Sequence, residues 1–253
     1  MIDISEKSFE ESIDSGLAGH GYCKRAPEDY DRNLCLIQAD LFDFLYATQP
    51  KEWERLKKIC GPDAKSRLLK RLFDEIERRG TLEVLRKGIK SDGCRFQLAY
   101  FRPVSGLNAE LQRLYEANVF SSVRQIHYSP KTEQSLDLGL FLNGLPIFTA
   151  ELKNPLTGQT VENAVKQYRF DRDPKESLFD FCRCMAHFAV DPDLVYVASS
   201  LTGPKTRFLP FNLGRDGGAG NPPSCRGYST AYLWEQIWAK DSVLNLFSTS
   251  STS

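Results

Sequence analysis

Two acidic residues and a lysine stand out in the middle of the chain. Asp137 is followed fourteen residues later by the tripeptide Glu151-Leu152-Lys153, which lies in an otherwise apolar run. Residues two apart in a strand point to the same face, so we expect Glu151 and Lys153 to project side by side. A carboxylate and an ammonium in such a run are costly to desolvate unless they meet partners or a metal. The pattern therefore favours a functional role.

The chemistry that suits this set is the hydrolysis of phosphodiesters. Carboxylates without neighbouring His or Cys are hard oxygen ligands, which fit Mg²⁺ or Mn²⁺ better than Zn²⁺. A metal acidifies the attacking water, while an ammonium stabilises the remaining negative charge. The alternative is a surface Glu–Lys pair on an edge strand with Asp137 in a turn, because an isolated D…ExK match is common by chance.

The runs SLDLGLFL and PIFTAELK predict a β-hairpin around Asn143-Gly144, a strong turn dipeptide. A regular two-residue hairpin would place the side chains of Asp137 and Glu151 on opposite faces of the sheet. Since a shared metal needs both carboxylates on one face, we predict one extra residue between positions 142 and 147, through a three-residue loop or a β-bulge. Pro146 is the expected place, because it has no N–H for the ladder.

The elements around the hairpin alternate between helical and strand patterns. Helical periodicity covers 5–17, about 27–90, and the closing run AYLWEQIWAKDSVLNLF. The region 27–90 predicts three or four helices, broken at Pro50, Gly61-Pro62 and Gly80. Strand patterns follow in CRFQLAYFRP and NVFSSVRQIHYSP, where we expect the sheet to begin, with a short helix between them, and again in DLVYVASS.

Thr160 is a candidate cap for a helix to about 171, and the Gly/Pro-rich segment of about 202–227 predicts a loop. The expected fold is α/β, a single domain over 1–253 with a mixed β-sheet flanked by helices and an N-terminal helical insertion.

Composition and charge exclude several classes of function. The chain has 33 Lys+Arg and 33 Asp+Glu, so a nucleic-acid site would have to be a local patch. Segment 51–90, with thirteen basic and seven acidic residues, is such a patch or a solvated helical surface. No secretory signal or membrane span is present in the sequence, so we expect a soluble, cytoplasmic protein. The seven cysteines are scattered, form no zinc-binding motif with the histidines, and are expected to be reduced thiols.

The hairpin and its flanking sequence resemble a known family. Asp137 and Glu151-x-Lys153 across a hairpin, with a helix next in line, resemble the PD-(D/E)xK nuclease core, and the string LDLGLFLNGLPIFTAELKNPLTGQTVENAVKQYR resembles the N-terminal nuclease domain of the R subunit of type I restriction enzymes. The similarity continues through RDPKESLF, HFAV, LVYVASS and KTRFLPFNLG and back to FEESIDSGLAGHGY. It covers most of the chain apart from 27–90.

The resemblance implies roles for individual residues. Asp137 and Glu151 would bind Mg²⁺ or Mn²⁺, the Leu152 carbonyl would add a ligand, and Lys153 would be the catalytic lysine. Glu10 on the opening helix would supply a further acidic ligand, with Glu6 as its competitor.

The helix after the hairpin is expected to meet DNA. Gln167 matches the glutamine of the Q-x3-Y motif of many relatives, but position 171 is Asp where they have tyrosine, and residue 136 is Leu where the superfamily name has Pro. Asn163, Lys166, Gln167 and Phe170 share one helical face, which suits contacts to a DNA backbone. The alternative is that this face is only exposed to solvent, while the opposite face packs on the sheet through Val161, Ala164, Val165 and Tyr168.

The resemblance also implies an assembly. R subunits continue into an ATP-driven DNA motor, and the sequence contains no Walker motif, so ATP would belong to motor domains absent from this chain. The implied partners are double-stranded DNA and the methyltransferase and specificity subunits of a type I restriction complex. Two alternatives stay open: a docking module with no activity in isolation, and a stand-alone DNA repair or recombination nuclease of the same superfamily.

Overall fold

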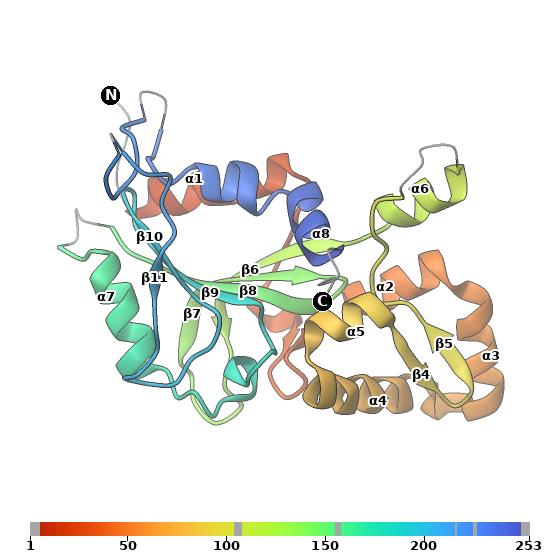
Figure 1. The fold of residues 1–253 in the computed structure, drawn as a ribbon. Helices are drawn as coiled ribbons and strands as arrows, with labels where there is room; N and C mark the ends of the chain where they lie inside the picture. The colour runs from red at the N-terminus through yellow and green to blue at the C-terminus, as the bar shows by residue number, and fades with distance from the viewer. Residues whose placement is uncertain (1–5, 104–107, 155–157, 216, 225–226, 249–253) are drawn as a thin grey trace.

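The fold is built around a seven-stranded sheet. The computed structural model describes residues 6–103, 108–154, 158–215, 217–224 and 227–248 (Figure 1). The strand order is β1-β6-β7-β8-β9-β10-β11. The strands are β1 (Cys23–Arg25), β6 (Phe120–His127), β7 (Ser135–Leu142), β8 (Leu145–Leu152), β9 (Ala186–Val190), β10 (Val195–Ala198) and β11 (Leu209–Pro210).

The pairing in this sheet is mixed. Strands β6, β7 and β8 form an antiparallel meander, while β1 pairs parallel to β6 and β9 pairs parallel to β8. Strands β9, β10 and β11 are antiparallel. The predicted α/β class, a mixed sheet flanked by helices, is confirmed, and it is consistent with a restriction-endonuclease-like fold.

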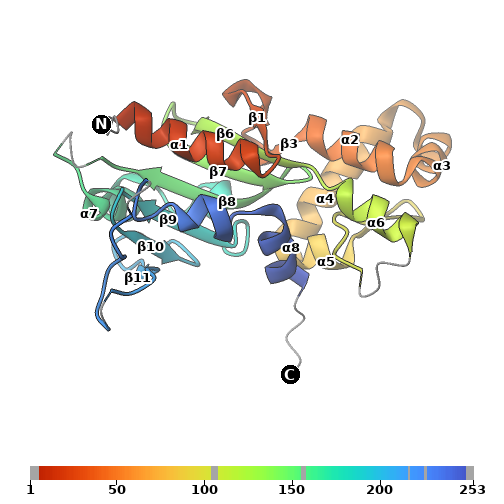
Figure 2. The ribbon, with the colours of Figure 1, turned by 90° about the horizontal axis from the view of Figure 1, so that it is seen from above.

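Helices cover both faces of the sheet (Figures 1 and 2). On one face, α1 (Glu6–Gly19) lies beside the π-helix η6 (Leu233–Ile237), with α8 (Lys240–Ser248) next to it. Apolar side chains of α1 share a core with Leu138, Phe148 and Phe188 of the strands. On the other face, α7 (Val161–Lys166) and the π-helix η4 (Gln167–Asp171) contact the sheet through Val161, Ala164 and Tyr168. Neighbouring residues of one strand therefore belong to different layers, as the pleat requires.

A helical region lies beside one end of the sheet (Figure 1). It contains α2 (Gln38–Thr48), α3 (Pro50–Cys60), η2 (Gly61–Asp63), α4 (Ala64–Arg79) and α5 (Thr81–Lys87). The predicted breaks at Pro50, Gly61-Pro62 and Gly80 are confirmed. Much of its basic charge is paired within the region, most densely around buried Glu75, which pairs with Arg71, Arg78 and Arg79. These pairs favour the solvated-surface interpretation of 51–90.

The remaining elements are short. Two small antiparallel sheets are formed by β2 (Tyr30–Asp31) with β3 (Leu36–Ile37), and by β4 (Ile89–Ser91) with β5 (Cys94–Phe96). Helix α6 (Ala109–Glu116) is capped by Asn108, and η1 (Pro27–Asp29) and η5 (Ser177–Phe179) are 3₁₀ turns, as is η2.

Two expectations about the elements were wrong, and two strands were missed. The strand pattern from Cys94 contributes only β5, which pairs with β4 rather than with the main sheet, because Gly93 makes a tight local turn at φ +80°. The closing run is not one helix but η6 followed by α8. Strands β1 and β9 were not predicted, since each is short and takes its place through parallel pairing with a distant strand.

The turn of the β7–β8 hairpin is buried instead of exposed. Gly144 has φ +81°, and a Cβ there would lie 2.3 Å from the carbonyl oxygen of Ile37, at the start of the helical region. Its own carbonyl accepts from the Ile37 N–H at 2.9 Å. The Asn143 amide donates to the Leu98 carbonyl and to Asn118, and its oxygen accepts from the Val119 N–H. The turn is thus clamped between the helical region and the sheet.

Within the residues that the structure describes, no helix combines the length and apolar character needed to cross a membrane. The six described cysteines are free, which agrees with the expectation of reduced thiols, and Cys225 lies outside the described residues.

Candidate metal-dependent nuclease site

A β-bulge in the hairpin sets the geometry of the site. Leu142 pairs with Leu145 across a two-residue turn, but the register shifts between Leu140 and Phe141, which leaves Ile147 as the extra residue. The predicted irregularity is confirmed, as a bulge next to the expected place. Pro146 itself pairs with Phe141, because the position after the closing pair of a two-residue hairpin needs no N–H in the ladder.

Beyond the bulge, Asp137 and Glu151 lie opposite each other. Leu138 pairs with Ala150, so the next positions along the two strands face one another on the same side of the sheet. Asp137 Oδ2 accepts from the Leu152 N–H at 2.8 Å, in place of a backbone partner. This bond draws the Asp137 carboxylate onto the end of β8, beside Glu151.

Glu151 is fully buried and only half satisfied. Arg172 donates to its Oε1 through Nε at 2.8 Å and also lies 2.6 Å from it through a terminal nitrogen. Its Oε2 has no hydrogen-bond partner among the described residues. Burial, and next the charge of Asp137, raise the pKa of Glu151 to about 8 against the opposing effect of Arg172. Without a cation, Glu151 therefore holds a proton at neutral pH.

Lys153 completes the set. Its Nζ lies 3.6 Å from Asp137 Oδ2, and its side chain is only 12% exposed. Its N–H donates to the Val190 carbonyl of β9, which holds the residue at the end of the parallel pair β8–β9. The structure thus brings together Asp137, Glu151 and Lys153 as the sequence predicts.

These residues fit a hard divalent cation. A buried oxygen without a donor, facing a second carboxylate, is the arrangement that a cation would satisfy, and Mg²⁺ is commonly held by one or two carboxylates with waters and substrate oxygens. No group of three or more His, Cys, Asp or Glu side chains able to hold a metal occurs in the described part of the chain. Among the described residues, Asp137 and Glu151 are the candidate carboxylate ligands, and the Leu152 carbonyl and Glu10 stay predicted ligands.

A strained residue lies directly opposite Asp137. Gln125 on β6 has φ +48°, a left-handed conformation that is uncommon for residues other than glycine, and it interrupts the pairing between β6 and β7. Its amide Nε2 donates to Asp137 Oδ1 at 3.3 Å, and its Oε1 accepts from the Ser135 hydroxyl at 3.1 Å. Strain of this kind persists only where the surroundings hold it, and it concentrates at functional sites.

The sequence interpretation missed Arg172. The chain leaves α7 as the π-helix η4, and the wider turn directs Asp171 to solvent while Arg172 is buried. Arg172 also donates to the Ser135 carbonyl at 2.8 Å. Its spacing from Ala164 and Tyr168 places a charge on the buried helical face, and this signal could have revealed it.

The outer face of α7 is solvent-exposed, as both alternatives allowed. Lys166 is exposed, Gln167 is half-buried and Phe170 is 66% exposed. The Asn163 side chain accepts from the Thr160 N–H in the capping box, so part of its hydrogen-bonding capacity serves the helix itself. The inner residue Tyr168 is buried, with its hydroxyl 2.9 Å from Thr149 Oγ1. Contacts of Asn163, Lys166 and Gln167 to DNA stay predictions.

The opening helix has acidic residues on two sides. Glu10 pairs with Arg124, whose strand position is opposite Leu138 on the α1 face of the sheet. Burial lowers the pKa of Arg124, and the charge of Asp137 opposes this effect. The role of Glu10 as a ligand stays a prediction, and the side chain of Glu6 lies outside the described residues.

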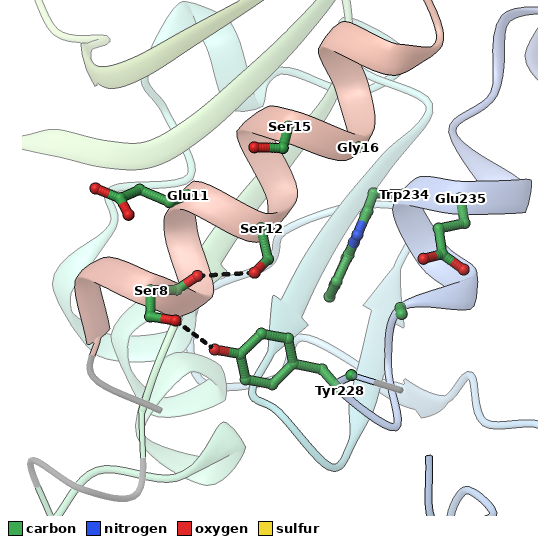
Figure 3. A pocket seen from close by; sticks show the side chains of 10 residues that line it. Ser8, Glu11, Ser12, Ser15, Gly16, Tyr228, Trp234 and Glu235 are labelled. Carbon is green, nitrogen blue, oxygen red and sulfur yellow. Dashed lines mark hydrogen bonds between the residues drawn. The ribbon is translucent and has the colours of Figure 1, made fainter. Parts of the chain in front are cut away.

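A cavity of about 550 Å³ between α1 and η6 lies on another side of α1 (Figure 3). Its lining includes Ser8, Glu11, Ser12 and Trp234, and none of the predicted site residues. Gly16 is required there, because a Cβ would lie 2.2 Å from the Trp234 ring. The acidic side chain of α1 that lines this cavity is thus Glu11, not Glu10.

Comparison with known proteins identifies the family. The family model described as type I restriction enzyme R protein N terminus matches residues 4–206, a span that includes the helical region 27–90. A search of curated proteins finds no match. Since the matched span is well over half of the chain, the protein belongs to the family of type I restriction enzyme R protein N-terminal regions.

Proposed function

We propose that the protein is a metal-dependent endonuclease domain that hydrolyses DNA phosphodiester bonds. The observation that carries this proposal is the bulged hairpin, which places Asp137, Glu151 and Lys153 on one face and leaves Glu151 Oε2 without a partner. A bound Mg²⁺ or Mn²⁺ would neutralise phosphate charge and lower the pKa of a bound water.

The chain's own residues would divide the remaining work. The carboxylates of Asp137 and Glu151 would hold the cation, helped by the Leu152 carbonyl. Lys153, beside Asp137 and sheltered from solvent, would donate to a phosphate oxygen and stabilise negative charge there. The exposed face of α7, with Lys166 and Gln167, would contact the DNA backbone.

The family supports a place for this activity in a larger assembly. As part of a type I restriction enzyme R protein, the domain would cut after ATP-driven translocation by a motor and together with methyltransferase and specificity subunits. Mg²⁺, double-stranded DNA and these subunits are therefore the proposed cofactor and partners. The alternative function is a docking module, which would bind the other subunits but would not cleave DNA.

A cleavage assay with a matched pair of lysine variants tests the proposal. Lys153→Ala should reduce Mn²⁺-dependent cleavage of double-stranded DNA by about 100-fold or more, because one preorganised charge stabiliser is lost. Lys24→Ala is the control, since Lys24 also pairs with an aspartate, Asp14 at 2.7 Å, but outside the site. Cleavage that survives in Lys153→Ala at the level of the control would contradict the assignment.

Metal binding provides a second test. Asp137→Ala should weaken Mn²⁺ binding measured by calorimetry, because it removes one of the two carboxylate ligands. Unchanged Mn²⁺ affinity in this variant would show that the cation lies elsewhere.

A further inference from the structure

Arg172 binds one oxygen of Glu151 and leaves the other free. Both of its close contacts to the carboxylate, at 2.8 and 2.6 Å, go to Oε1. The second oxygen, Oε2, is the one without a partner among the described residues. A carboxylate held this way cannot exchange its oxygens by rotation without breaking the contacts to the guanidinium. The arrangement therefore fixes which oxygen is presented to the space shared with Asp137.

Arg172 also ties together the elements that carry the two carboxylates. It follows η4, donates to the Ser135 carbonyl at the start of β7, and reaches Glu151 on β8. Ser135 lies two residues before Asp137 on the same strand face. The guanidinium stacks over the Tyr128 ring at 5.6 Å, which limits its own movement. One buried side chain thus connects the positions of both predicted ligands.

We propose that Arg172 is a positioning residue for the metal site, which holds Glu151 with Oε2 directed to the cation. This inference rests on the proposed nuclease function and adds a residue to it. Of the two Glu151 oxygens, Arg172 donates only to Oε1, which leaves Oε2 for the cation. It does not touch the substrate or the cation itself, so its effect is exerted through Glu151. Ligand carboxylates are commonly held by such hydrogen-bonding partners, whose loss weakens metal affinity about 10- to 100-fold.

The competing interpretation is that Arg172 only compensates a buried charge. The chain contains a matched pair for comparison: Arg25 lies 2.5 Å from Oδ1 of Asp40, a carboxylate that is likewise fully buried but is not part of the site. Removing either arginine should destabilise the fold, because a buried carboxylate then loses the guanidinium that pairs with it. Only the loss of a positioning residue should also weaken metal binding.

The experiment measures Mn²⁺ affinity by calorimetry and unfolding by urea for Arg172→Met, Arg172→Lys and Arg25→Met. We expect Arg172→Met to lower Mn²⁺ affinity about 10- to 100-fold, whereas Arg25→Met lowers the urea midpoint and keeps wild-type affinity. Arg172→Lys should recover part of the affinity, since an ammonium can bond Oε1 but cannot reproduce the two-nitrogen contact. If Arg172→Met does not fold, the Arg172→Lys variant decides, because it keeps the charge and loses only that contact.

Wild-type Mn²⁺ affinity in the folded Arg172 variants would overturn the positioning role. Asp137→Ala distinguishes this outcome from failure of the proposed function. If Asp137→Ala loses Mn²⁺ binding while the Arg172 variants keep it, the site stands and only the role of Arg172 is wrong. If the wild-type protein does not bind Mn²⁺, or if Asp137→Ala binds it equally well, the site and the role of Arg172 are both wrong.

Discussion

Replacing Glu151 by Gln should remove a pH dependence of stability from the metal-free protein. The pKa of Glu151 rises from an ordinary 4.5 to about 8 in the fold, through burial and then the charge of Asp137. A raised pKa means that the folded protein binds this proton more tightly than the unfolded chain does. The stabilising contribution of the proton is complete below pH 4.5 and is lost as the pH rises toward 8.

The size of the effect follows from the shift. A change of this size corresponds to about 5 kcal/mol over the whole window. Between pH 6.5 and 8 the loss should be about 2 kcal/mol of unfolding free energy. Burial also lowers the pKa of His187, to about 3, but this contribution changes only below the ordinary value of 6.5. The comparison of wild type with Glu151→Gln, which keeps His187 and the cysteines, therefore isolates the effect of Glu151 between pH 6.5 and 8.

The assay is urea unfolding in the presence of a chelator, with wild type and Glu151→Gln compared at each pH. The glutamine resembles the protonated acid, because it keeps an oxygen for Arg172 and offers an N–H to Asp137, so its stability should be flat across this window. Saturating Mg²⁺ should flatten the wild-type curve, since the cation takes the place of the proton. If chelated wild type ran parallel to Glu151→Gln between pH 6.5 and 8, Glu151 would be ionised in the metal-free fold and our explanation of the site's electrostatics would be wrong.

Three further substitutions have expected outcomes. In Lys153→Ala, Mn²⁺ affinity and the urea midpoint should stay near wild type, because both carboxylates remain; a large loss of metal affinity would make the lysine part of the cation site and not a charge stabiliser. Gln125→Gly should raise the unfolding free energy by about 1 kcal/mol, because it relieves the left-handed strain. The Mn²⁺ affinity of this variant should fall, because Asp137 loses a hydrogen-bond donor. A destabilised variant with wild-type Mn²⁺ affinity would contradict both expectations. Asn143→Ala should cost about 3 kcal/mol or more in urea unfolding, because three buried hydrogen bonds are lost and φ +51° no longer has a tolerant residue, and a change below about 1 kcal/mol would contradict the buried clamp.

The parts of the fold that the sequence predicts are those determined by local pattern. The Asn-Gly turn, the alternation in β7 and β8 and the breaks at Pro50 and Gly80 depend on neighbouring residues only. The bulge was predicted from a chemical requirement, that two ligands share a face, and its position was displaced to Ile147 because the pairing of Pro146 needs no N–H. Local pattern and one constraint therefore locate the three central residues.

The parts that the sequence does not predict depend on distant contacts. Arg172 was missed because the Q-x3-Y comparison directed attention to position 171, whereas the partners that give Arg172 its place, Glu151 and Ser135, lie on other strands. The left-handed conformation of Gln125 accompanies hydrogen bonds to Asp137 and Ser135, which lie opposite it on another strand. Strand β9 takes its place by parallel pairing with β8 after a connection through α7, which no short window can show.

The buried turn of the β7–β8 hairpin has a mechanical consequence. Both strands run from the turn, where Gly144 packs against Ile37, past the bulge at Ile147 to the end that carries Asp137 and Glu151. The hairpin is thus held at its turn by the helical region and carries the two carboxylates at its other end. We therefore expect a substitution that displaces the start of α2 to change the spacing of the two carboxylates, because Ile37 and Gly144 join that helix to the hairpin.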